Sequence, residues 1–154
     1  MAVADEYNYH VVTDEADQYS YFRIDGSEFT NDIHIALSKS GKHSKKKLEI
    51  VIGGWSGEKS VIRQDAKAIH STESLTKEHS KADFNKIKGD IRVFVFDGEL
   101  IIRGGNDIFM QYKDSSIIKN ELRYLLVSGG WGGHGTYRIT GFKAEGEKGG
   151  KNFK

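Results

Sequence analysis

Apolar residues recur at every second position in several segments of this chain. In DIHIALS, residues 32–38, isoleucine and leucine alternate with polar or small residues, and LEIVI, residues 48–52, repeats the pattern. A period of two places alternate side chains on opposite faces of a β-strand. Both segments are therefore predicted to be half-buried strands.

Glycine marks the corners between such segments. The chain has 18 glycines and no proline, so glycine, asparagine and aspartate must form its turns. Gly53-Gly54 is predicted to close a hairpin between LEIVI and SVIR, and Asp97-Gly98 is predicted to close one between IRVFVF and ELIIR. Gly104-Gly105 and Gly129-Gly130 mark two further corners.

Two segments lack a clear period. Residues 64–88 are interpreted as a long loop with short strands, and a helix over part of this segment is the main alternative. The five lysines between residues 39 and 47 predict a solvated loop that joins two strands.

The number of short β-rich segments determines the expected fold class. About ten strands with glycine turns, and scarcely any helical stripe, predict an all-β protein built as an antiparallel two-sheet β-sandwich. A length of 154 residues is typical of one domain. We expect its core at about residues 19–142 and a flexible basic tail at residues 143–154.

Composition and charge exclude several functional classes. Hydrophobic residues make up 37% of the chain and charged residues 29%, no apolar run approaches the length of a membrane span, and the net charge is +1. We therefore expect neither membrane insertion nor nucleic-acid binding. The absence of cysteine excludes disulfides and thiolate nucleophiles. The N-terminal residues show no secretory signal, which favours a cytoplasmic location or secretion without a leader.

The sequence Gly-Gly-Trp occurs twice, ending at Trp55 and Trp131. A loop that binds a nucleotide or a methyl donor needs a glycine turn that leads from a strand into a helix. The first copy leads instead into SVIR, in which Val61 and Ile62 are β-branched, and the Gly-Lys-Ser or Gly-Lys-Thr sequence of a phosphate loop does not occur. We therefore predict a hairpin corner and no cofactor.

Aromatic and polar residues gather at the predicted turns. Trp55 and Trp131 are the only tryptophans, and each stands seven or eight residues before an arginine. An exposed tryptophan can stack on the apolar face of a sugar ring while nearby polar groups bond its hydroxyls. The alternative, that each tryptophan packs on the core and each arginine pairs with a surface acid, stays open. The candidate ligand-binding residues are Trp55, Arg63, Asn106, Asp107, Trp131 and His134.

Catalytic and metal chemistry is harder to place. No two of the six histidines have the spacing of a helical metal site, and Gly-x-Ser-x-Gly does not occur, so no catalytic residue is predicted. A carboxylate pair for glycoside hydrolysis cannot be placed from sequence and stays open. Asn106 and Asp107 could bind Ca²⁺ together with carbonyl oxygens, although there is no EF-hand loop.

Four blocks carry a resemblance to a known family. DIHIALS, LEIVIGGWSGEKSVIR, FVFDGELIIRGGNDIFMQYKD and VSGGWGGHGTYRI occur in this order between about residues 19 and 142. This part of the chain resembles the invertebrate domain family named after farnesoic acid O-methyltransferase. The resemblance implies a galectin-like or jelly-roll sandwich with a ligand-binding role. The family name implies methyl transfer from S-adenosylmethionine to a sesquiterpenoid acid.

The leading hypothesis is a non-enzymatic, lectin-like protein that binds carbohydrate, with galactose-type sugars as the expected ligands. Its site would lie on one rim or on a concave sheet face. Because avidity strengthens weak single-site binding, we expect a homodimer or a higher homo-oligomer. Two alternatives stay open: an S-adenosylmethionine-dependent O-methyltransferase, and a protein-interaction module that uses an exposed sheet surface or the lysine loop.

Overall fold

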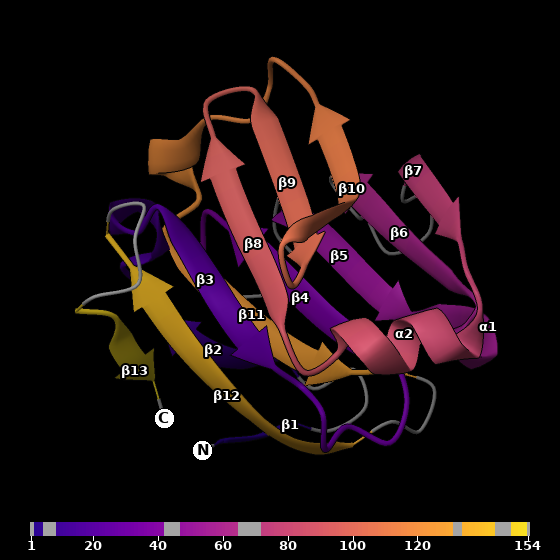
Figure 1. Cartoon of the computed structure of the whole chain (residues 1–154). Coiled ribbons are helices and arrows are strands. Elements are labelled where there is room, and N and C mark those ends of the chain that lie inside the picture. The colour runs from indigo at the N-terminus through magenta and orange to yellow at the C-terminus, as the bar shows by residue number, and fades with distance from the viewer. Residues whose placement is uncertain are drawn as a thin grey trace.

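Two antiparallel β-sheets pack face to face in this protein (Figure 1). The structure is a computed structural model, and it describes residues 2–4, 9–41, 47–64, 72–130, 134–143 and 149–153. The prediction of an all-β, antiparallel two-sheet sandwich is confirmed.

As far as the described residues show, the first sheet has six strands in the order β2-β11-β4-β5-β6-β7. Their bounds are His10–Thr13 for β2, Ile33–Ser38 for β4, Lys47–Gly53 for β5, Lys59–Gln64 for β6, Thr72–Glu78 for β7 and Tyr124–Gly129 for β11. The two segments predicted from alternation, β4 and β5, are antiparallel neighbours in the middle of this sheet.

The described part of the second sheet has seven strands, six of them in the order β1-β12-β3-β8-β9-β10, and β13 also pairs with β12. Their bounds are Ala2–Ala4 for β1, Tyr21–Asp25 for β3, Ile91–Phe96 for β8, Glu99–Gly104 for β9, Asp107–Lys113 for β10, Gly135–Phe142 for β12 and Lys151–Phe153 for β13. Strand β13 lies within the segment predicted to be a flexible tail, and the Phe153 ring packs 5.5 Å from that of Tyr19.

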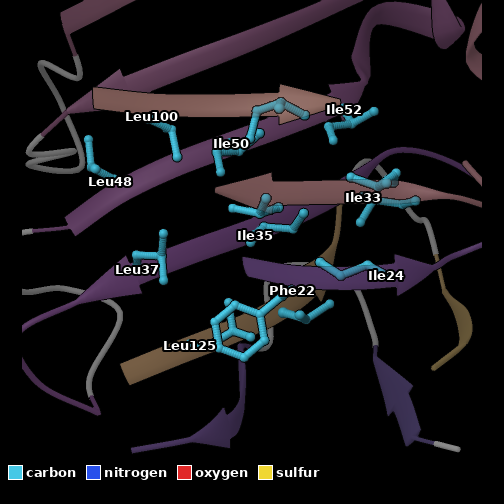
Figure 2. Packing of buried hydrophobic residues seen from close by; sticks show 14 of the residues in the cluster. Phe22, Ile24, Ile33, Ile35, Leu37, Leu48, Ile50, Ile52, Leu100 and Leu125 are labelled. Carbon is cyan, nitrogen blue, oxygen red and sulfur yellow. The ribbon is translucent and has the colours of Figure 1, made fainter. Parts of the chain in front are cut away.

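Aliphatic side chains from both sheets fill the space between them. On β4, Ile33, Ile35 and Leu37 point into this core, and each is at most 2% exposed. Figure 2 shows them beside Ile50 of β5 and Leu125 of β11. Because burial of one such side chain contributes about 1.5–3 kcal/mol, the apolar positions decide which face of each strand turns inward. The intervening polar residues consequently point away from the core.

The segment at residues 64–88 contains both a strand and a helix. Strand β7 agrees with the expected short strands, and α2 (Lys81–Ile87) agrees with the helical alternative. The helix begins at Ser80, whose hydroxyl accepts from the backbone N–H of Asp83 while the Asp83 carboxylate accepts from that of Ser80. Residues 65–71, and residues 42–46 of the lysine loop, lie outside the described residues.

In the described ranges, three further helical segments are short. They are α1 (Gly54–Gly57), which joins β5 to β6, and two 3-10 turns at Ala16–Gln18 and Lys119–Glu121. In the part of the chain that the structure describes, no helix is long and apolar enough to cross a membrane.

Several connections meet at one end of the sandwich, at the lower right of Figure 1. A Cβ added to Gly57 of α1 would lie 3.1 Å from Lys81 of α2, and Gly104 at the end of β9 packs against Ile87. The backbone N–H of Thr30, between β3 and β4, donates to the carbonyl of His134 over 2.9 Å. This end of the sandwich therefore brings together the α1 corner, α2, the end of β9 and His134.

Candidate functional site

Gly54 and Gly130, one from each Gly-Gly-Trp sequence, face the same carboxylate. A Cβ added to Gly130 would lie 2.6 Å from Asp32 Oδ2, and a Cβ added to Gly54 would lie 3.8 Å from that atom. The first distance is far inside van der Waals contact, so the position of Gly130 has no room for a side chain. Asp32 is itself fully buried. The two repeated corners therefore converge on one buried carboxylate.

The first corner holds Trp55 in a strained backbone conformation. Trp55 has a φ of 53° and Ser56 a φ of 62°, and among the described residues these are the non-glycine positions with positive φ. The left-handed region costs a non-glycine residue about 1–2 kcal/mol. Such strain is concentrated at ligand and active sites. The strained Trp55 side chain is 38% exposed, so the corner presents an indole ring to solvent.

Arg63 connects this exposed ring to the first sheet. The guanidinium carbon of Arg63 lies 5.9 Å from the centroid of the Trp55 ring, within reach of a cation–π interaction. Its Nη1 donates to Glu49 Oε1 over 3.5 Å, and the two residues stand opposite each other on β5 and β6. Because Glu49 is only 6% exposed, the partner of this arginine is a buried acid rather than a surface acid.

Four ionisable side chains lie on the face of the first sheet that points away from the core. Asp32, His34, Glu49 and Arg63 are called the outer-face cluster below. His34 Nε2 donates to Asp32 Oδ2 over 2.7 Å, and His34 Nδ1 lies 4.0 Å from Glu49 Oε2. Two carboxylates thus face two basic groups, and this pairing offsets part of the cost of removing charges from water.

The cluster is buried although it faces away from the core. The side chains of Asp32, His34 and Glu49 are 1%, 6% and 8% exposed, and that of Arg63 is 23% exposed. Within the described residues, Asp32 Oδ1 and Arg63 Nε have no hydrogen-bond partner. Since buried polar atoms are nearly always paired, these two atoms are places where a polar ligand can form bonds that the protein itself does not make.

Tyr9, the residue before β2, contacts the cluster from the edge of the sheet. Its hydroxyl donates to Glu49 Oε2. Burial, and then the negative charge of Glu49, raise the pKa of the Tyr9 hydroxyl far above its ordinary value. The hydroxyl therefore stays protonated at neutral pH and acts as a donor to the carboxylate.

A cleft of about 590 Å³ opens at the same end of the sandwich, where β7, α2 and the β9–β10 turn meet. We call it the end cleft. Asp107 lines one side of it, and Asp83 and Lys86 of α2 line another. Its aromatic wall is Phe109, with the Lys77 ammonium 4.4 Å from the ring centroid. The volume lies in the range of small-molecule pockets.

His79, which also lines the end cleft, has both ring nitrogens engaged. Its Nδ1 lies 3.1 Å from the carbonyl of Ser80, so that nitrogen donates, and its Nε2 lies 2.8 Å from the Ser60 hydroxyl. The Ser60 oxygen also accepts from the backbone N–H of Gly53. These bonds fix the ring between β6 and α2, which is a structural role.

The predicted ligand-binding residues do not form one site. Asn106 and Asp107 are exposed in and next to the β9–β10 turn, and Asp107 reaches the end cleft. His134 is exposed and its Nδ1 lies 3.1 Å from the Thr30 hydroxyl. Trp131 lies outside the described residues. Only Trp55 and Arg63 therefore contact each other, among those predicted residues whose positions the structure describes.

Metal binding gains no support from the side-chain arrangement. Among the residues that the structure describes, no group of three or more histidine, aspartate or glutamate side chains is placed to hold a metal ion. Ca²⁺ binding by Asn106 and Asp107 consequently stays a prediction.

Three members of the outer-face cluster were not predicted from the sequence. Asp32, His34 and Glu49 occupy the polar positions in the alternating segments, where a charged residue is ordinarily solvated. Their position next to apolar residues in DIHIALS and LEIVI was a signal, but a weak one. Only the order of β4, β5 and β6 in the sheet shows that these side chains and Arg63 are neighbours.

Comparison with known proteins gives a family match and several matches of fold. The model of the family described as farnesoic acid methyl transferase matches residues 4–143. No curated protein sequence matches the chain. Sheep galectin-11, solved in a complex with glycerol, superposes with a TM-score of 0.50 at 11% identity, over 87% of this chain and 97% of the galectin.

Two larger proteins superpose less well. SCLam, a non-specific endo-β-1,3(4)-glucanase from family GH16, gives a TM-score of 0.47 at 13% identity, over 78% of this chain and 56% of the glucanase. LamAcat from Zobellia galactanivorans gives 0.44 at 8% identity, over 98% and 64% of the two chains. At these identities the galectin match shows a shared fold and no more.

Proposed function

This chain belongs to the farnesoic acid methyl transferase family, and we propose that it binds carbohydrate at the Trp55 corner without catalysing a reaction. The single observation that carries this proposal is the strained, exposed Trp55 with Arg63 against its ring. A backbone conformation that costs free energy is retained when the side chain it presents is needed.

The chemistry of the corner fits a sugar. The C–H groups of a pyranose ring form an apolar face that packs on an indole ring, as other apolar surfaces do. The Arg63 guanidinium offers donors to ring hydroxyls, and Glu49 holds that guanidinium in place. Tryptophan thus supplies contact area while arginine selects the orientation of hydroxyls, a division of roles common in small-molecule sites.

The fold gives a second, weaker line of support. Sheep galectin-11, which was solved in a complex with the polyol glycerol, shares the two-sheet architecture. This argument is by analogy of fold. It makes galactose and lactose the first ligands to test.

The family description names a methyl transfer, which we do not propose for this chain. The Gly53–Gly57 corner continues into strand β6 and not into a helix. The free amides of a helix N-terminus, which hold the anionic or carboxylate part of such cofactors, are therefore lacking at this corner.

A glycan array probed with and without calcium, followed by calorimetric titration, tests the proposal. Binding that is lost in Trp55→Ala and retained in Phe96→Ala supports it, because Phe96 is an equally exposed aromatic on the other sheet. Binding that survives Trp55→Ala but is lost in Asp107→Ala places the ligand in the end cleft instead. No binding to any glycan contradicts the proposal.

Oligomerisation belongs to the same proposal. A weak single site gains orders of magnitude in avidity when it is presented in pairs. We propose a homodimer, which light scattering coupled to gel filtration detects directly; a monomer at all accessible concentrations contradicts it.

A further inference from the structure

The burial of the outer-face cluster raises the question of what covers it. Asp32, His34 and Glu49 lie on the face opposite to the core, yet each is less than one-tenth exposed. A face that is permanently covered is ordinarily apolar, because burying charged groups is costly even when they are paired. Ionisable groups buried on this face therefore require a specific reason, such as a role in binding.

Tyr9 forms a side-chain hydrogen bond to Glu49 of the cluster. Strands β11 and β4 lie between β2 and β5 in the sheet, so Tyr9 extends from the edge strand over both of them to reach Glu49. Its hydroxyl is also close enough to Ser128 of β11 for a hydrogen bond to influence it. The hydroxyl of Tyr9 therefore lies on the outer face between Ser128 of β11 and Glu49 of β5.

The strand that carries Tyr9 is weakly attached. Strand β2 has four residues, it is at the edge of the sheet, and its register with β11 shifts between Leu125 and Leu126. Short edge strands with irregular pairing open locally at lower free energy than central strands. Tyr9 can thus leave the cluster without disruption of β4, β5 and β6.

The contact between Tyr9 and Glu49 has the chemistry of a ligand contact. A neutral hydroxyl donates to a buried carboxylate, which is the bond that a sugar hydroxyl would form with the same oxygen. In this closed arrangement Asp32 Oδ1 and Arg63 Nε have no hydrogen-bond partner within the described residues. A polyhydroxyl ligand can supply hydroxyls to Glu49, to Asp32 and to Arg63 together, whereas Tyr9 has one hydroxyl only.

We propose that Tyr9 is an internal cover of the outer-face cluster, and that a ligand hydroxyl takes the place of its hydroxyl on Glu49 when sugar binds beside Trp55. This inference rests on the proposed function, because it assigns to the same ligand a second set of contacts. The cover lowers the apparent affinity of the site by the fraction of molecules in which it is open. Removal of the cover therefore tightens binding.

The cover itself is tested without any sugar. Diethyl pyrocarbonate modifies accessible imidazoles, and peptide mass spectrometry of the intact chain after reaction gives the rate at each histidine. We expect His34 to react at least about fivefold faster in Tyr9→Ala than in the unmodified sequence. His134, which is exposed in the structure, is the internal reference and should react at the same rate in both. Equal protection of His34 in both proteins overturns the proposal.

Ligand binding is the second measurement, with lactose as the probe. Tyr9→Phe keeps the ring and removes the hydroxyl, so it is the matched variant if Tyr9→Ala loses stability. We expect lactose to bind about tenfold more tightly to Tyr9→Ala and by a smaller factor to Tyr9→Phe. An unchanged affinity in Tyr9→Ala, with His34 exposed, also overturns the proposal. Failure of every variant to bind lactose or any arrayed glycan contradicts the proposed function. In that case the labelling rate of His34 still shows, without any sugar, whether Tyr9 covers the cluster.

Discussion

The guanidinium of Arg63 lies 5.9 Å from the ring centroid of Trp55, and the same guanidinium is bonded to the buried carboxylate of Glu49. An exposed aromatic ring is thereby coupled, through one arginine, to an ionic cluster on the outer face of the sheet. Substitution of each residue by itself therefore distinguishes the role of the aromatic ring from the role of the ionic cluster.

Trp55 is expected to favour binding at the expense of stability. Trp55→Asn removes the indole but keeps a residue that tolerates the left-handed region. We expect this variant to keep or gain up to about 1 kcal/mol of stability and to lose at least about tenfold in sugar affinity, since tenfold corresponds to about 1.4 kcal/mol. Urea unfolding and calorimetric titration measure the two effects.

Ser56→Gly is the control for that experiment. It relieves the strain at the neighbouring position, where φ is 62°, and leaves the indole in place. Stability should rise while binding is retained. Equal losses of binding in both variants would show that the shape of the corner, and not the indole, holds the ligand.

Glu49→Gln should destabilise the outer-face cluster. The change removes one of two carboxylates and leaves Arg63 and His34 with less compensating charge. We expect a loss of about 2 kcal/mol, below the usual value for a broken buried pair because Arg63 is partly exposed. Glu99→Gln breaks a pair with the exposed Lys113 on the other sheet, in which Glu99 is itself partly exposed, and should cost less than about 1 kcal/mol. Similar losses from both changes would contradict the importance of the cluster.

Gly130→Ala should be strongly destabilising although alanine is a small residue. The added Cβ would lie 2.6 Å from Asp32 Oδ2 and would also overlap His34, so one of these buried groups must move. A cost of about 2 kcal/mol or more is expected from thermal or urea unfolding. Gly89→Ala is the matched control, because the nearest atom to its Cβ would be 3.7 Å away. A tolerated Gly130→Ala would show that the corner is looser than its geometry indicates.

The N-terminus of α2 should show a pH-dependent contribution to stability. Hydrogen bonds from the side chain and then the backbone of Ser80 hold the pKa of the Asp83 carboxyl below its ordinary value. A carboxyl whose folded pKa is lowered stabilises the fold above its unfolded pKa of about 3.9, and this contribution disappears as the pH falls through the folded pKa.

Ser80→Ala removes the cap and is expected to cost about 1 kcal/mol at pH 7. The difference from the unmodified sequence should be smaller near pH 3, because part of it depends on the ionised Asp83. Urea unfolding at both pH values measures the difference. Ser115→Ala, an exposed serine in a turn, should be neutral at both. A difference that is independent of pH would contradict the contribution of Asp83.

Sequence and structure agree where local patterns carry the information. Alternation in DIHIALS identified β4 and the inward positions of Ile33, Ile35 and Leu37. Asp97-Gly98 and Gly53-Gly54 identified hairpin corners, because these residues form turns that others form at a cost. The segment at residues 64–88 was less clear, since a seven-residue strand and a seven-residue helix are each too short to show a strong period.

The candidate site, like the fold, was predicted from the sequence only in part. The sequence alone predicted most of the strands, the corners, and Trp55 and Arg63 as candidate members of one site, because these depend on residues close together in the chain. Only the tertiary structure decided that Asp32, His34 and Glu49 join Arg63, that Tyr9 reaches Glu49, and that Gly54 and Gly130 face the same carboxylate. The physical reason is that the order of strands in a sheet brings distant residues together, and no local pattern specifies that order.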